Sequence, residues 1–140
     1  MAIHKKLTSL ERQLMVAPRR VLLGTPSWKD DVPSVGGVYA IWSKKGKLKY
    51  VGETCHLKHR CKDLERTVNH TFRKKMAASY GMQGCSNVDL SKKLSKQFLY
   101  SFLAVDFGRK ELEEYVVVKW RSSIINKPPK RLLLRKTNYD

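Results

Sequence analysis

Apolar residues recur along the chain with two different spacings, and these spacings predict the helices and strands. Leu7, Leu10 and Leu14 follow helical spacing, so residues 1–23 are expected to contain a helix with one packed face. Residues 97–105 are nearly all apolar, which is typical of a central strand covered on both faces.

A short basic segment separates two further apolar stretches and favours a β-hairpin. Residues 37–43 and 47–52 are expected to be its strands, and the link between them contains the tight turn Lys45-Gly46-Lys47. The two strands are therefore expected to pair side by side in one sheet.

Helical spacing returns after the hairpin. Leu57, Cys61 and Leu64 line one face of a helix that is expected to begin near Cys55. The pattern then predicts helix over residues 69–80, a loop over residues 81–90 and a strong helix over about residues 109–122. This order is typical of an α/β (α+β) fold, in which a small antiparallel three-stranded sheet is flanked by helices.

The charge of the chain indicates its class of partner. The chain carries 29 Lys and Arg against 12 Asp and Glu, a formal net charge of +17. A field of this sign attracts polyanions, so nucleic acid is the favoured partner and an anionic membrane surface is the weaker alternative. Three cysteines in unrelated contexts argue for a reducing compartment. With no apolar run of membrane-spanning length, the chain is expected to be intracellular, in the cytoplasm and associated with the nucleoid.

Five sequence features together resemble the GIY-YIG nuclease superfamily. Residues 37–39 (Gly-Val-Tyr) and 50–52 (Tyr-Val-Gly) resemble the two halves of its signature, with ten residues between the two tyrosines. Arg60 lies ten residues after the second tyrosine, where the family carries an arginine on its first helix. Residues 112–117 resemble the helix that carries the metal-binding glutamate, and Asn126 resembles the terminal asparagine of the family. The resemblance extends over roughly residues 36–127.

The resemblance implies a metal-dependent DNA endonuclease with a β-β-α-β-α core. It implies that a metal-activated water hydrolyses the phosphodiester bond with Mg²⁺ (or Mn²⁺), and that Tyr50 is the general base while Tyr39 orients the water or the phosphate. Which tyrosine takes the proton stays open. The residues themselves fit this chemistry, because Arg60 offers a permanent positive charge whose fork matches phosphate oxygens. RNA as a substrate and a dimeric assembly also stay open, and the alternative function is a non-catalytic nucleic-acid-binding module that retains the nuclease fold.

The metal-binding glutamate has to be chosen mainly from two neighbours on the last helix, with Glu111 as a third, weaker candidate. At about 100° per residue from Leu112, Glu113 lies inside the apolar arc of the helix and Glu114 lies outside it. A carboxylate on a buried face is unfavourable unless it binds something, so helical phase favours Glu113 as the metal ligand. The spacing to Asn126, twelve residues after Glu114, favours Glu114 instead, and Glu114 stays the alternative.

One position departs from the family pattern. The family often carries a His or Tyr one turn after its arginine, and here that position is Leu64, which cannot take part in proton transfer. We expect His70, in the following segment, to supply the missing polar group, and His59, next to Arg60, is another option. The predicted catalytic set is Tyr39, Tyr50, Arg60, His70, Glu113 and Asn126.

Basic side chains outside this set are expected to contact nucleic acid. The predicted contacts are Arg73, Lys74, Lys75, Lys92 and Lys93. The chain is expected to divide into an N-terminal helix with a connecting loop (residues 1–35), a catalytic domain (residues 36–127) and a basic C-terminal tail (residues 128–140).

Overall fold

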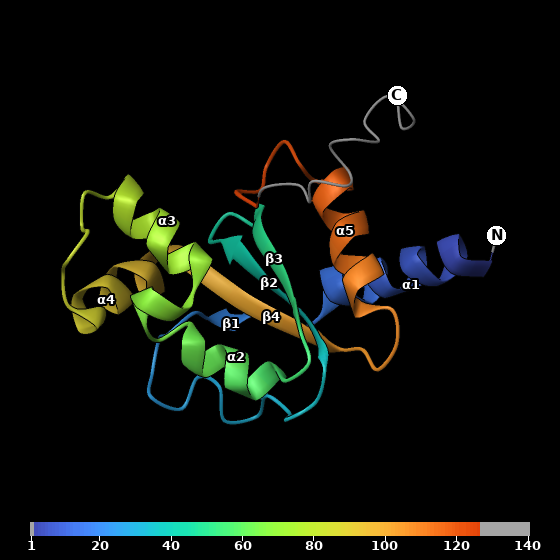
Figure 1. Ribbon diagram of the computed structural model, residues 1–140, viewed down its shortest axis with the longest axis horizontal. Helices are drawn as coiled ribbons and strands as arrows, with labels where there is room; N and C mark the ends of the chain where they lie inside the picture. The colour runs from blue at the N-terminus through green and yellow to red at the C-terminus, as the bar shows by residue number, and fades with distance from the viewer. Residues whose placement is uncertain (1, 127–140) are drawn as a thin grey trace.

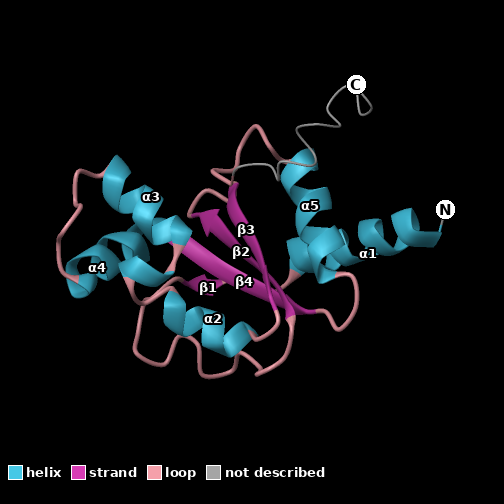
Figure 2. Cartoon of the chain, viewed as in Figure 1, coloured by secondary structure: helices cyan, strands magenta, loops and turns pink. Residues whose placement is uncertain are grey.

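A computed structural model of the chain describes residues 2–126. It confirms an α+β fold, in which one antiparallel sheet has helices on both faces (Figure 1; Figure 2). The helices are α1 (Ala2–Val16), α2 (Leu57–Asp63), the 3-10 turn η1 (Thr67–Asn69), α3 (Thr71–Ser79), α4 (Asn87–Gln97) and α5 (Arg109–Lys119). The strands are β1 (Arg20–Val21), β2 (Gly37–Ser43), β3 (Leu48–Thr54) and β4 (Phe98–Ala104). The expected C-terminal tail, residues 128–140, lies outside the described residues.

The sheet has four strands in the order β1-β4-β2-β3, so the expected three-stranded sheet was wrong by one strand. The additional strand β1 pairs with β4 through Arg20 opposite Tyr100 and Val21 opposite Leu99. A strand of two residues is too short to show alternation of apolar and polar positions, and the sequence pattern therefore missed it. As expected, β4 is a central strand, whereas β3 forms an edge of the sheet.

The two faces of the sheet carry separate cores, because successive residues of a strand point to opposite sides. On one face Tyr39, Ile41 and Tyr50 pack against residues of α2, α3 and α4. On the other face Val38 and Val51 pack against residues of α1 and α5. The hairpin β2–β3 thus sends its tyrosines to the α2–α3 side.

The helices are short, and one of them was not expected. Residues 81–90 were predicted to be a loop, but α4 begins at Asn87, where the Ser86 hydroxyl accepts a hydrogen bond from the Asp89 amide at 3.1 Å. Serine before a helix is a common N-cap, so the missed start had a local signature. Within residues 2–126, no helix combines the length and the apolar character needed to cross a membrane.

Candidate active site

Two tyrosines of the hairpin lie together on the α2–α3 side of the sheet. Tyr39 lies opposite Gly52 in the strand register and is 1% exposed, whereas Tyr50 lies opposite Ile41 and is 8% exposed. The two rings are nearly parallel, with centroids 6.3 Å apart and planes at 29°. The hairpin therefore positions two phenols next to each other, and Tyr50 is the more accessible one.

Gly52 provides the space that the Tyr39 ring occupies. A Cβ atom at residue 52 would lie 2.3 Å from both Cζ and Oη of Tyr39, which is far closer than van der Waals contact. The ring lies against the β3 backbone at this point. Glycine in the second half of the signature therefore has a steric role, which the sequence pattern did not reveal.

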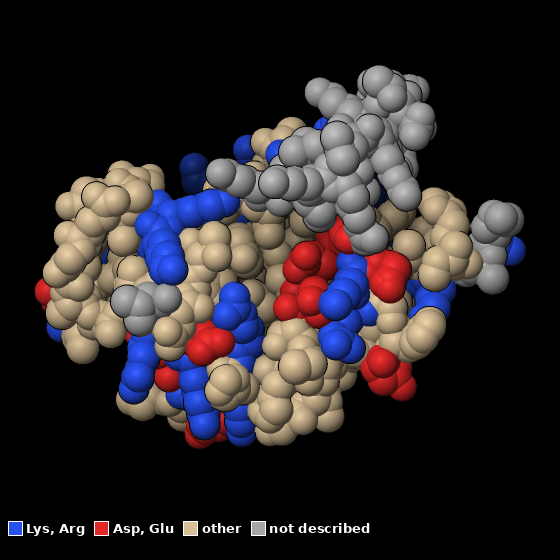
Figure 3. Space-filling view, viewed as in Figure 1, with Lys and Arg blue, Asp and Glu red and all other residues tan. Residues whose placement is uncertain are grey.

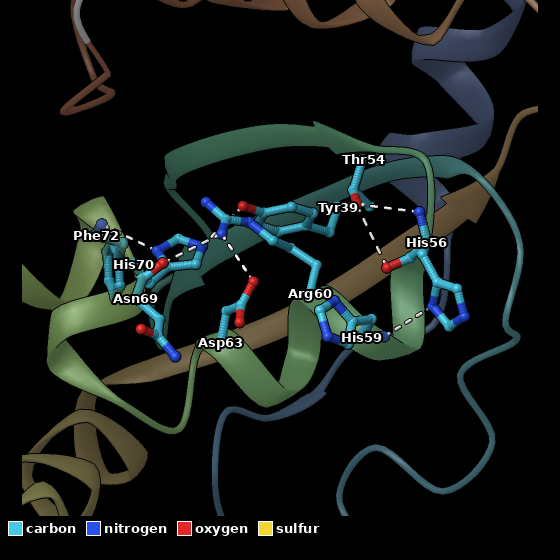
Figure 4. Close-up of polar contacts among 9 residues, drawn as sticks. All are labelled: Tyr39, Thr54, His56, His59, Arg60, Asp63, Asn69, His70 and Phe72. Atoms are coloured by element: carbon cyan, nitrogen blue, oxygen red, sulfur yellow. Dashed lines mark hydrogen bonds and ion pairs between the residues drawn. The ribbon is translucent and has the colours of Figure 1, made fainter.

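Arg60 reaches the tyrosines from α2, a helix capped by the side chain of His56. Arg60 Nη1 donates to Asp63 Oδ2 at 3.0 Å and to the backbone oxygen of Asn69 at 3.2 Å. Figure 4 shows the guanidinium beside the hydroxyl of Tyr39, and the two groups interact electrostatically. The positive charge is thus fixed next to a phenol by acceptors from α2 and η1.

His70 approaches the same hydroxyl from the start of α3. Its Nε2 lies 2.8 Å from Tyr39 Oη, and its Nδ1 accepts a hydrogen bond from the Phe72 amide at 3.0 Å as the N-cap of the helix (Figure 4). The ring is almost completely buried and contacts the Tyr50 ring at 5.6 Å between centroids. Leu64, at the position where the family often has a polar residue, lies fully inside the core. The structure therefore brings His70 to the site from a different element.

Glu113 approaches from α5, on the other face of the sheet, around the edge strand β3. Its Oε2 accepts a hydrogen bond from the Glu53 amide at 2.7 Å. The Glu53 carboxylate in turn accepts a hydrogen bond from Arg109 Nε at 3.0 Å. Glu114 instead lines a cavity of about 530 Å³ between α1 and α5. Glu113 interacts electrostatically with both tyrosines and with Arg60.

Burial and mutual repulsion shift the acidic groups of the site in one direction. Burial raises the pKa of Tyr39, and the neighbouring Tyr50 raises it further, whereas Arg60 lowers it. Burial also raises the pKa of Tyr50, with Arg60 again opposing the shift. Burial raises the pKa of Glu113, and the hydrogen bond from the Glu53 amide opposes that shift. The site thus disfavours negative charge until a further positive charge enters it.

The imidazole of His70 is shifted in the opposite sense. Burial, followed by the positive charges of Arg60 and Arg73, lowers the pKa of His70 to about 3. Its ring is therefore neutral at physiological pH.

Asn126 lies at the edge of the site and binds the backbone of β3. Its Oδ1 accepts from the Val51 amide at 3.0 Å, and its Nδ2 donates to the Val51 carbonyl at 2.7 Å. The Ile125 amide donates to the Lys49 carbonyl at 2.8 Å beside it. The segment after α5 therefore lies along the edge strand and covers part of its open hydrogen-bonding groups.

The expectation that Arg73 contacts nucleic acid is wrong, because its side chain is 0% exposed. Its guanidinium instead ties α3 to the end of α2, to η1 and to α4. The acceptors are Leu64 O, Asn87 O, Ser91 Oγ and Thr67 Oγ1. A basic residue that the sequence suggests as a ligand contact can therefore be a structural residue, when acceptors within the fold satisfy its N–H donors.

The other predicted contacts lie on two helices. Lys74 on α3 and both Lys92 and Lys93 on α4 are exposed. Lys75 is half-buried, and its Nζ donates to the Ile125 carbonyl at 2.7 Å. On the face in Figure 3, Lys and Arg side chains lie over α2 and α3, and Asp and Glu side chains gather between β3 and α5. Basic side chains thus lie on the α2–α3 side of this face, and acidic ones on the α5 side.

The donor set suits a hydrated divalent cation better than a cation enclosed by protein. Within residues 2–126, no three side chains of His, Cys, Asp and Glu are grouped to hold a metal. In the same range, Glu113 Oε1 accepts no hydrogen bond, while Oε2 is held by the Glu53 amide. One oriented carboxylate oxygen fits Mg²⁺, which retains several waters and binds substrate phosphate.

Comparison with known proteins gives one match. The family model of the GIY-YIG catalytic domain matches residues 35–127, which include the hairpin, α2 to α5 and Asn126. A search of curated proteins found no significant match. A search of solved structures found none either.

Proposed function

Because the chain belongs to the GIY-YIG catalytic domain family, we propose that it is a metal-dependent endonuclease that hydrolyses phosphodiester bonds in DNA. The observation that carries this proposal is the convergence of side chains from β2, β3, α2, α3 and α5 on one side of the β3 edge. Burial of several ionisable groups around one carboxylate opposes folding stability, and such an arrangement is typical of a functional site.

Arg60 would bind the non-bridging oxygens of the scissile phosphate. Its planar guanidinium matches phosphate geometry and keeps its charge at every physiological pH. Asp63 and the Asn69 carbonyl already hold the side chain, so little conformational entropy is lost when a phosphate binds. The fixed charge would stabilise the negative charge that develops on the phosphate oxygens in the transition state.

Tyr50 would take the proton of the attacking water, and Tyr39 would orient the water or the phosphate. Tyr50 is the more exposed phenol, and its pKa is raised by burial and lowered by Arg60. An additional positive charge in the site would lower that pKa further and favour loss of the phenol proton. Tyr39 is almost fully buried and held by His70, which fits an orienting role.

Glu113 would hold Mg²⁺ (or Mn²⁺) through Oε1, with Glu114 as the alternative ligand. A divalent cation would lower the pKa of a water bound to it and would neutralise charge on the phosphate. Because the pKa of Glu113 is raised, protons compete with a cation for this carboxylate more strongly than for an ordinary glutamate. Asn126 would act as a positioning residue that holds the segment after α5 against β3.

The basic surface would bring the nucleic acid to the site. The net charge of +17 favours rapid, salt-dependent association with a polyanion. Lys74 lies on α3, one turn beyond His70, where it would contact a backbone phosphate next to the scissile one. Lys92 and Lys93 on α4 would extend the contact away from the site.

Cleavage of supercoiled plasmid tests the proposal. The purified chain is incubated with Mg²⁺, with Mn²⁺ or with EDTA, and nicked and linear products are expected only when a cation is present. A parallel reaction with a single-stranded RNA measures the preference for DNA. An intact plasmid under every cation, together with retardation of duplex DNA in a native gel, would identify the non-catalytic binding module instead.

A further inference from the structure

His70 uses both of its ring nitrogens, and the two partners differ in kind. On one side, Nδ1 lies 3.0 Å from the backbone amide of Phe72. On the other side, Nε2 lies 2.8 Å from the hydroxyl of Tyr39. An amide can only donate, whereas a hydroxyl can donate or accept.

The amide decides which nitrogen carries the proton. Because the Phe72 amide donates to Nδ1, Nδ1 has a free lone pair and no hydrogen. A neutral imidazole carries one proton, so that proton is on Nε2 and points to Tyr39 Oη. Protonation of Nδ1 would direct two N–H groups at each other and would remove the N-cap of α3.

The tautomer of His70 also decides what the Tyr39 hydroxyl does towards this ring. A phenol oxygen has two acceptor positions and one proton. His70 Nε2 takes one acceptor position, and the Arg60 guanidinium lies beside the same oxygen. Because Nε2 carries a hydrogen, the Tyr39 proton cannot point to His70, and the neighbouring phenol whose ring lies alongside is that of Tyr50.

We propose that His70 is a positioning residue locked in the Nε2–H tautomer, which donates to Tyr39 and thereby directs the Tyr39 proton to Tyr50. It does not accept the proton of Tyr39, and so it is not a base that activates this phenol. The consequence for cleavage rests on the proposed function, whereas the tautomer and the direction of the hydrogen bonds do not.

The surroundings of the ring keep this tautomer over a wide pH range. The charged and titratable groups that face His70 are Arg60 from α2, Arg73 from α3, Tyr39 from β2 and Tyr50 from β3. Two of them are permanent cations, and neither tyrosine provides a negative charge at neutral pH. Together with burial, they oppose a protonated ring, in agreement with the low pKa of His70.

Long-range ¹H–¹⁵N correlation spectra of the labelled full chain test the tautomer directly. The chain has four histidines, and His70→Asn identifies the signals of residue 70. We expect the neutral Nε2–H pattern from about pH 5 to pH 8, on both sides of the ordinary histidine pKa. A neutral Nδ1–H pattern, or titration of this ring within that range, would overturn the proposal. In Tyr39→Phe, the tautomer should persist while the Nε2–H resonance shifts and exchanges faster with water; an unchanged resonance would also overturn it.

A double-mutant comparison tests the connection to cleavage. Asparagine at residue 70 can still accept from the Phe72 amide but is too short to reach Tyr39. We expect His70→Asn to lower kcat about tenfold, the effect of one lost hydrogen bond, and to leave KM unchanged. In the Tyr39→Phe background it should cause no further loss, and His4→Asn on α1 is the matched control.

Equal losses from His70→Asn in both backgrounds would show that His70 acts independently of Tyr39 and would overturn the proposal. If the wild-type chain cleaves nothing, the proposed function fails, but the spectra still decide the tautomer. The two failures are therefore distinguishable.

Discussion

The contact between α1 and α5 contains a buried glutamate, the site at the β3 edge contains a half-buried one, and the two differ in their partners. Glu11 on α1 is 4% exposed, and its two oxygens accept from Lys119 Nζ and Trp120 Nε1, each at 2.8 Å. Glu113 is less buried, yet within residues 2–126 only one of its oxygens accepts a hydrogen bond, from the Glu53 amide. Burial alone therefore does not mark a functional carboxylate. An oxygen that is directed into a site without a partner is the better indicator.

Two arginines show the same difference. Arg73 is completely buried, and acceptors from α2, η1 and α4 satisfy its donors. Arg60 is half-buried beside the Tyr39 hydroxyl, and within residues 2–126 only its Nη1 donates hydrogen bonds, to Asp63 and to the Asn69 carbonyl. The first arginine connects elements of the fold, and the second presents its charge to the site.

The largest expected effect is that of Glu113→Gln. Glutamine retains an acceptor for the Glu53 amide but cannot hold a divalent cation. We expect plasmid cleavage to fall by on the order of 10³-fold, with a melting temperature at or above that of the wild type, because burial disfavours the charge that is removed. Glu114→Gln is the matched control and should cleave normally. Loss of cleavage in Glu114→Gln alone would reverse the assignment.

Arg60→Gln should have the next largest effect on cleavage. Loss of the fixed charge beside Tyr39 is expected to lower the rate by about 10²-fold while DNA retardation in a native gel changes little. Arg73→Gln should instead lower the melting temperature, because three elements lose a shared donor. If Arg73→Gln abolished cleavage in a fully folded protein, the distinction between the two arginines would be incorrect.

Gly52→Ala tests the steric support of the site. The added Cβ would lie 2.3 Å from the Tyr39 ring, so the ring must move and the packing on it must adjust. We expect a loss of about 1–3 kcal/mol in the free energy of unfolding. Gly36→Ala is the control, since its Cβ would have no neighbour closer than 3.5 Å. Chemical denaturation measures both, and equal effects would argue against this role of Gly52.

Glu11→Gln examines the structural member of the glutamate pair. Glutamine has one acceptor oxygen and no charge, so it can keep only one of the two hydrogen bonds from Lys119 and Trp120. We expect a loss of about 1–2 kcal/mol in the free energy of unfolding. Cleavage per folded molecule should be unchanged, because Glu11 contacts α5 away from Glu113. If Glu11→Gln cleaved poorly while its unfolding free energy stayed unchanged, Glu11 would not be a purely structural residue.

The last prediction concerns acid pH. His70 has a pKa of about 3 in the folded chain, so the unfolded chain binds a proton more readily than the folded one. The contribution of His70 to the free energy of unfolding is fully present above the pKa of the unfolded chain, about 6.5. It decreases as the pH falls from there towards 3. In His70→Asn the slope of unfolding free energy against pH should be shallower in that window. An unchanged slope would show that another group causes the acid sensitivity.

Much of the fold could be predicted from local patterns. Alternation and turn residues located β2 and β3, the apolar run located β4, and helical spacing located α1, α2 and α5. The two-residue strand β1 has no such pattern, because it is stabilised only by pairing with β4. The start of α4 has a capping serine, but the glycines just before it are typical of a loop and favoured that prediction.

The sequence by itself determined which chemical groups are available and roughly where they lie on each element. The hairpin brings Tyr39 and Tyr50 together, because cross-strand neighbours follow from a short turn. Helical phase distinguished Glu113 from Glu114, since the angle between consecutive residues is set by helix geometry. These are local properties, and local geometry follows from neighbouring residues.

Only the tertiary structure decided which of these groups meet. His70 lies 31 residues from Tyr39, and Glu113 lies 60 residues from the Glu53 amide that orients it. Burial of Arg73 follows in the same way from the packing of α2, η1 and α4 around one side chain. Such contacts depend on how the faces of the sheet are covered, and no repeat or spacing along the chain encodes that packing.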